Sequence, residues 1–122
     1  MSVFVGAPQP LSGSSFGMGI PVTATSSPGN TVHTAQSGTG GSDKIYLWVS
    51  NVTSSPRKLT VQYGGTSDVT DDLVYQGTVP PNTLQPILIC DGLLLQDGLL
   101  IKAWADVASA LNIFGHILPI TN

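Results

Sequence analysis

The residues with the spacing needed for hydrolytic chemistry form a single motif. Gly13-Ser14-Ser15-Phe16-Gly17 matches the G-x-S-x-G pattern of a serine nucleophile, and His116 follows far along the chain. A nucleophile elbow requires a strand before the serine and a helix after it, within a large α/β sheet. Here the motif lies in a stretch rich in Gly and Ser, so we interpret it as a chance match. We predict that the protein is not an enzyme.

The remaining candidates for a metal or cofactor site are isolated. His33 and His116 each lie alone in an apolar pattern, which predicts a core or interface imidazole with a backbone partner. Cys90 follows Ile87-Leu88-Ile89, with no basic residue nearby to activate the thiol, so we expect a small buried hydrophobe. These residues predict no cofactor and no metal.

Two further motifs have the form of a site without its context. Three aspartates in a short stretch offer oxygen ligands of the type that Ca²⁺ prefers, but their spacing fits no EF-hand loop, and we expect a solvated turn. They are Asp68, Asp71 and Asp72. Asn51-Val52-Thr53 is a glycosylation sequon, a match expected by chance in a chain so rich in Thr.

Composition excludes several classes of partner. Only 9% of the 122 residues are charged, against about 25% in an ordinary soluble domain. The net charge is −3, and four Lys and Arg residues provide no basic cluster for phosphate backbones or anionic lipids. We therefore expect neither a nucleic acid nor a membrane as partner. The sequence also shows no basic signal-peptide start, which predicts synthesis in the cytoplasm without a targeting segment.

The spacing of the apolar residues predicts an all-β fold. Strong helix formers are scarce beside 14 Gly and 9 Pro, and short alternating segments are separated by turn residues. We predict an antiparallel β-sandwich of jelly-roll type, residues 20–122, preceded by an extended N-terminal arm, residues 1–19, whose removal leaves the sandwich folded. About eight strands are expected, at 20–25, 31–36, 45–52, 57–63, 73–79, 84–90, 99–105 and 111–120.

Two connections carry specific predictions. Asp91-Gly92 and Asp97-Gly98 each have the residues of a tight turn, because both can adopt a positive φ, so each predicts a chain reversal. The last two strands are expected to form a hairpin through residues 106–110, or else these residues form one helical turn.

Two of the expected strands are apolar on both faces. In 45–52 the second face holds Tyr46, Trp48 and Val52, and in 111–120 it holds Phe114, Leu118 and Ile120. An antiparallel sheet with one face in water alternates instead, so the arm, a neighbouring subunit or both must cover these side chains. The residues expected at an interface are Phe4, Phe16, Tyr46, Trp48, Phe114, Leu118 and Ile120.

The aromatic residues also permit a second interpretation. Rings exposed on a β-sandwich can stack on sugars, and an uncharged surface suits neutral polymers. The more common role of Trp and Tyr is as anchors of a core or an interface, which we favour here. The residues concerned are Tyr46, Trp48, Tyr63, Tyr75 and Trp104.

Several strand and turn segments together resemble the small virion proteins of tailed bacteriophages, in particular the capsid decoration or cement class. The segments are 44–51, 59–66, 79–83, 91–95 and 112–117. The resemblance implies a β-rich homo-oligomer, a dimer or trimer, on the capsid surface of the virion, where it binds across neighbouring major capsid subunits and stabilises the shell. It implies no catalytic residues. The alternatives are a carbohydrate-binding module at a phage tail tip and a structural subunit of the neck or tail.

Overall fold

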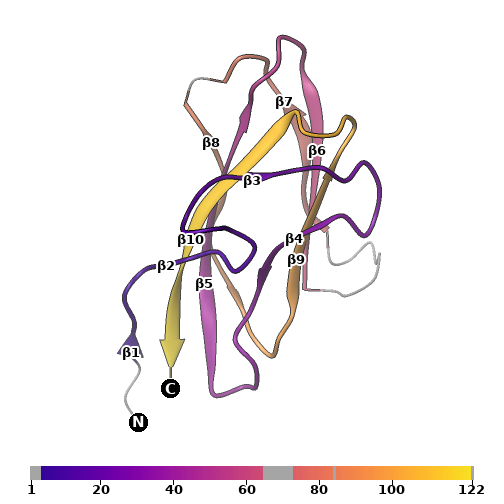
Figure 1. Cartoon of the computed structure of the whole chain (residues 1–122). Helices are drawn as coiled ribbons and strands as arrows, with labels where there is room; N and C mark the ends of the chain where they lie inside the picture. Colours follow the sequence, from indigo (N-terminus) through magenta and orange to yellow (C-terminus); the bar gives the residue numbers. More distant parts are fainter. Residues whose placement is uncertain (1–3, 65–72, 84, 122) are drawn as a thin grey trace.

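The computed structural model describes residues 4–64, 73–83 and 85–121, and these form ten β-strands in two antiparallel sheets that face each other (Figure 1). The described residues contain no helix, and hence none long and apolar enough to cross a membrane. The prediction of an all-β chain built from antiparallel sheets is confirmed. The two strands beyond the expected eight are short and lie in the N-terminal segment.

The first sheet, sheet A, is built around its two longest strands, which pair along their whole length. Their outer neighbours are one long strand on one side and three two-residue strands on the other. In spatial order the sheet holds β1 (Phe4–Val5), β2 (Gln9–Pro10) and β3 (Ile20–Pro21), then β10 (Leu111–Thr121), β5 (Gly41–Asn51) and β8 (Ile87–Leu95).

The second sheet, sheet B, contains four strands, and the chain passes repeatedly between the two sheets. Its order is β4 (Asn30–Thr34), β9 (Leu100–Ala105), β6 (Arg57–Tyr63) and β7 (Leu73–Val79). The predicted hairpin of the last two strands is therefore wrong, because β9 lies in sheet B and β10 in sheet A. Their connection is a non-helical crossing from one sheet to the other.

The core lies between the sheets and follows the two-residue period of the strands. In β6 the side chains of Leu59, Val61 and Tyr63 are buried in it, as the alternation predicts. Cys90 is buried with them, also as predicted, and its thiol donates to the carbonyl of Ile45 over 3.3 Å.

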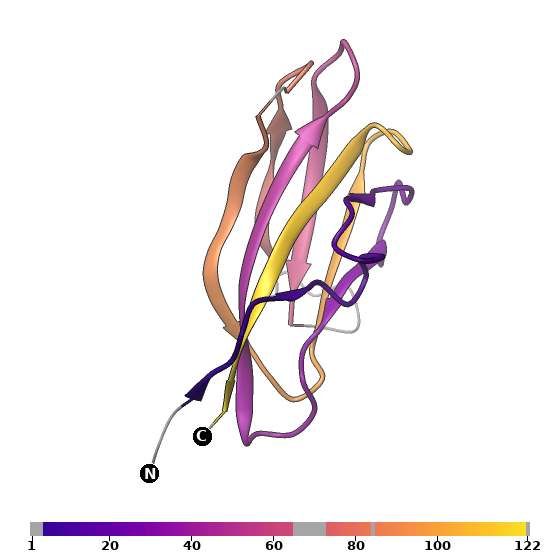
Figure 2. The ribbon, with the colours of Figure 1, turned by 60° about the vertical axis from the view of Figure 1, so that its left-hand side comes forward.

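The N-terminal segment closes the side of the sandwich between β10 and β4 (Figure 2). The amide of Gly13 donates to the carbonyl of Val32 in β4, and the amide of Val22 donates to the carbonyl of Leu111 in β10. Leu11 is only 2% exposed and belongs to the core. The segment therefore closes one side of the sandwich and adds Leu11 to the core, whereas the expected cover was for the second faces of the two long strands.

Of the two predicted reversals, one is confirmed and one is wrong. Asp97 and Gly98 have φ of 61° and 70° and form the turn from β8 to β9. At Asp91-Gly92 the chain continues instead, because β8 pairs with β5 on both sides of it. Gly92 is the extra residue of a β-bulge, with φ of 90°, between the pairs Tyr46–Asp91 and Ile45–Leu93.

Candidate interaction face

The outer face of sheet A carries the side chains that the sequence places on the second face of its two long strands. The register sets Phe114 of β10 opposite Trp48 of β5, and His116 opposite Tyr46. Because side chains on one face of a strand recur every second residue, Leu118 continues the same row. We call Tyr46, Trp48, Phe114, His116 and Leu118 the aromatic face.

Ring stacking holds the centre of the aromatic face together. The His116 imidazole stacks on the Tyr46 ring, with centroids 5.0 Å apart and planes at 21°. It also stacks on the Trp48 indole, with centroids 5.8 Å apart and planes at 26°. Lys44 extends the stack, since its Nζ lies 5.8 Å from the centroid of Tyr46. His116 is therefore part of an aromatic cluster, which its isolation in the sequence did not reveal.

The aromatic face continues onto β8, where it is exposed. Leu88 lies opposite Trp48 and Leu94 lies opposite Lys44, so both project from the same face of the sheet. Leu88 is 46% exposed and Leu94 55%. Beyond β8 this sheet has no further strand among the described residues. The apolar surface thus extends from the half-buried rings to two exposed leucines at a sheet edge.

The chain covers only one end of the aromatic face. Gly19 lies against the ring of Phe114, where a Cβ would be 2.7 Å from Cε1. Tyr46, Trp48 and Leu118 remain half-buried, as does Phe114 itself. Within residues 4–64, 73–83 and 85–121, the second face of neither strand is fully buried.

A turn next to this cover presents two apolar side chains to solvent. Phe16 is fully exposed at 100%, and Met18 is 67% exposed. The turn is held by hydrogen bonds from the Ser14 hydroxyl to the Met18 carbonyl, 2.6 Å, and from the Met18 amide to the Ser15 carbonyl, 3.0 Å. Since Met18 adjoins Gly19, this tip lies at the Phe114 end of the aromatic face.

The structure thus gathers most of the expected interface residues. Tyr46, Trp48, Phe114 and Leu118 share one face, and Ile120 follows on the same side of β10 and is half-buried. Phe4 lies in β1, opposite Thr121 at the far end of the same strand.

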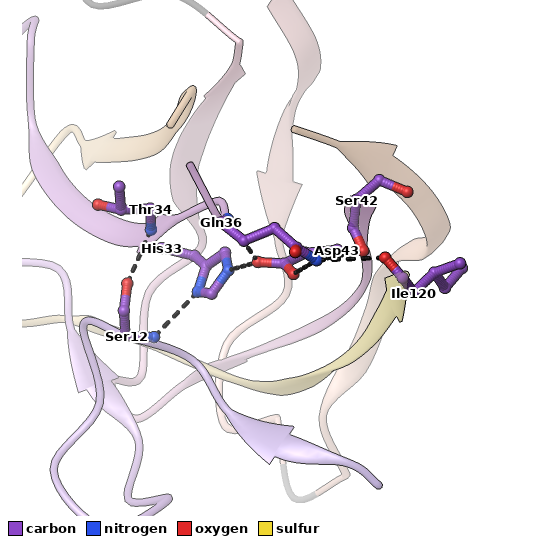
Figure 3. A network of polar contacts seen from close by, with 7 residues as sticks. All are labelled: Ser12, His33, Thr34, Gln36, Ser42, Asp43 and Ile120. Carbon is purple, nitrogen blue, oxygen red and sulfur yellow. Dashed lines mark hydrogen bonds and ion pairs between the residues drawn. The ribbon is translucent and has the colours of Figure 1, made fainter. Parts of the chain in front are cut away.

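A buried polar network, which the sequence did not predict, joins the N-terminal segment to both sheets (Figure 3). His33 is 4% and Asp43 3% exposed, and Nε2 of the imidazole lies 2.7 Å from Oδ2 of the carboxylate. The side-chain amide of Gln36 donates to Asp43 Oδ1 over 3.1 Å and to the carbonyls of Ser42 and Ile120. His33 and Asp43 are ten residues apart in the sequence, and no local motif marks them as partners.

The network contains a serine, a histidine and an aspartate, but their hydrogen bonds are not those of a nucleophilic triad. In a triad the histidine accepts the serine hydroxyl proton. Here His33 Nδ1 accepts the backbone amide of Ser12 over 3.0 Å, and the Ser12 hydroxyl oxygen accepts the amide of Thr34 over 2.7 Å. The arrangement fixes the N-terminal segment and does not activate the hydroxyl.

The other sequence candidates have structural environments or lie outside the described residues. Asn51 is 1% exposed, and its side-chain nitrogen donates to the carbonyls of Ser55 and Val79, so the sequon nitrogen is not accessible. Ser15 of the G-x-S-x-G match is exposed in the turn before β3. The three clustered aspartates are not among the described residues, which contain no group of three potential metal ligands.

A scan against protein-family models, a search of curated proteins and a search of solved structures find no match.

Proposed function

We propose that the chain is a structural protein of a virion that forms a homo-oligomer through the aromatic face and decorates the capsid across neighbouring major capsid subunits. The observation that carries this proposal is the half-open aromatic face, bordered by exposed Leu88 and Leu94. The sequence resemblance to decoration proteins supplies the virion and the capsid as the setting.

The strand order supports the finer assignment of the fold as a jelly roll. Strands β3 to β10 divide into β3-β10-β5-β8 and β4-β9-β6-β7. A jelly roll distributes eight strands over two sheets as two Greek keys, and the fold recurs in viral capsid and lectin domains.

Energetics favour a covered aromatic face. Apolar surface contributes roughly 25 cal/mol per Å² when it leaves water. A specific interface buries about 800 Å² on each partner, which is about an eighth of the 6377 Å² that this chain exposes. The face and the adjoining tip at Phe16 and Met18 present apolar side chains, and the charged residues beside them are Lys44 and Asp91, which lies opposite Tyr46.

The test starts from the mass of the purified protein in light scattering, where we expect a dimer or trimer. Leu88→Asp and Leu94→Asp place a charge on exposed positions of the face, so each should yield a folded monomer. The matched control is Val107→Asp, which lies in the connection between β9 and β10 at 39% exposure and should leave the mass unchanged. A monomeric wild-type protein at high concentration would contradict the proposal.

The capsid partner requires a second measurement with the same samples. Wild-type protein mixed with undecorated heads should sediment with them, whereas the monomeric Leu88→Asp and Leu94→Asp variants should bind less. An oligomer that heads do not recruit would instead support the neck or tail alternative.

A further inference from the structure

The outer face of sheet B, on the opposite side of the sandwich from the aromatic face, carries a groove of about 480 Å³. Its volume is within the 300–1,000 Å³ range of small-ligand sites. Its lining combines one indole with hydroxyl, amide and charged groups. These groups belong to Trp104, Thr60, Gln76, Lys58, Thr78 and Asp106.

Strand register builds the groove. Trp104 of β9, Thr60 of β6 and Gln76 of β7 lie directly opposite one another and form one row across the sheet. Lys58 and Thr78 form the next row on the same face, two residues along their strands. The rows come from three adjacent strands, so the sheet backbone fixes the spacing of these side chains.

The indole of Trp104 is supported by the residue directly before β4. Gly29 packs against it so closely that a Cβ there would be 3.1 Å from Cε3 and 2.3 Å from the carbonyl oxygen of Ala103. The indole is half-buried, and its remaining surface lines the groove. An aromatic ring held in this way is a preorganised platform for a flat ligand surface.

We propose that this groove binds a neutral saccharide, with one pyranose ring stacked on Trp104. A pyranose ring has an apolar C–H face and a rim of hydroxyls that both donate and accept hydrogen bonds. The hydroxyl of Thr78 and the amide of Gln76, both on exposed residues, have the same dual capacity, whereas Thr60 lines the groove at only 8% exposure. Lys58 and Asp106 bring one charge of each sign, so the groove has no net charge that would select an ionic ligand.

The proposal goes beyond the assembly function and does not depend on it. An oligomer formed through the aromatic face would bury sheet A and leave the outer face of sheet B open. The groove would then be repeated on the exterior of the assembly, once in each subunit.

The test uses the full-length protein and a panel of neutral trisaccharides built from glucose, galactose, mannose and N-acetylglucosamine, with a glucuronic acid trisaccharide as the acidic comparison. Affinity is measured by calorimetry. In the Trp48→Phe variant Trp104 is the sole tryptophan, because the chain contains two, so its fluorescence reports binding at the groove. We expect a saturable signal with at least one neutral trisaccharide and weaker binding of the acidic one.

Two variants locate the site by independent groups. Trp104→Ala and Gln76→Leu should each weaken binding by at least about tenfold, and Gln76→Leu does so with the indole retained. Gln96→Leu, an exposed glutamine in the turn after β8, is the matched control and should bind as wild type. The proposal is overturned if no neutral trisaccharide binds with Kd below about 10 mM, if both variants bind normally, or if the acidic trisaccharide is preferred. None of these outcomes bears on the oligomer mass, so the two proposals fail separately.

Discussion

His33 Nε2 and Asp43 Oδ2 lie 2.7 Å apart and are both buried. Because Nδ1 of the same ring accepts the Ser12 amide, the ring proton is on Nε2 and is donated to the carboxylate. A buried carboxylate is costly unless hydrogen bonds satisfy its oxygens. The backbone and side-chain amides of Gln36 supply two more donors, at 3.2 and 3.1 Å. The pair thereby joins β4 to β5 beneath the N-terminal segment.

Asp43→Asn should destabilise the protein by about 1.5–3 kcal/mol, the range for a hydrogen bond to a charged group. The introduced amide nitrogen would point its hydrogens at groups that are already donors, and the negative charge would be lost. Urea denaturation measures the free energy of unfolding. Asp106→Asn changes an exposed carboxylate in the same way and should stay within about 0.5 kcal/mol of wild type. Equal losses in the two variants would argue against the role of the buried pair.

Tyr63 gives the folded state a dependence on alkaline pH. Burial, with a contribution from the neighbouring Cys90 thiol, raises the pKa of Tyr63 well above its usual 10.0. The folded state therefore keeps the phenol proton after the unfolded state has lost it. The stability contribution is complete below pH 10.0 and decreases as the pH rises above that value, by about 1.4 kcal/mol per pH unit for this group.

The matched variant is Tyr63→Phe, which removes the titrating hydroxyl and keeps the buried ring. It should unfold near the wild-type denaturant midpoint at pH 7 and be less sensitive than wild type between pH 10 and 11. The difference between the two pH profiles isolates Tyr63 from the other tyrosines, the lysines and Cys90. Parallel profiles would contradict the assignment.

The bulge in β8 depends on Gly92. Its φ of 90° is a conformation that residues with a Cβ rarely adopt, and a Cβ would lie 2.8 Å from Lys44 Cε. Gly92→Ala should therefore cost about 1–3 kcal/mol. Gly40→Ala is the control, because a Cβ there meets nothing within 4 Å, and it should be neutral or slightly stabilising. Thermal unfolding of both variants measures the difference, and equal melting temperatures would argue against strain at the bulge.

The two Asp-Gly pairs of the chain show why the sequence alone could not predict every turn. Asp91-Gly92 is followed by three leucines and Asp97-Gly98 by two, and locally each predicts a turn. The difference is in the pairing partner. At Asp91 the strand still has β5 alongside it, whereas the last residue of β8 to pair with β5 is Leu95, opposite Asp43. Tertiary pairing therefore decides which Asp-Gly reverses the chain.

The features that depend on neighbouring residues within one strand could be predicted from the sequence. The two-residue alternation of β6 assigned Leu59, Val61 and Tyr63 to the core, and the apolar second faces of β5 and β10 form the aromatic face. The pairing of His33 with Asp43 was not predictable, because it depends on how residues 35–42 bring β4 next to β5. In the same way, the sequence alone permits sugar stacking by Tyr63 and Tyr75, whereas in the structure Tyr63 is buried in the core and Tyr75 packs against it.

The N-terminal segment combines a structural and an exposed part, and variants should separate them. Leu11 is 2% exposed in the core, so Leu11→Ala should cost about 2–5 kcal/mol, which argues against the expectation that residues 1–19 can be removed without unfolding. Phe16 is fully exposed, so Phe16→Ser should leave the free energy of unfolding unchanged. Denaturation of the two variants, with deletion of residues 1–8 as a control that retains Leu11 and Ser12, tests this division. If Phe16→Ser is fully stable but fails to form the oligomer or to bind capsids, the defect arises from the exposed tip. A Leu11→Ala variant as stable as wild type would show that the segment does not contribute to the core.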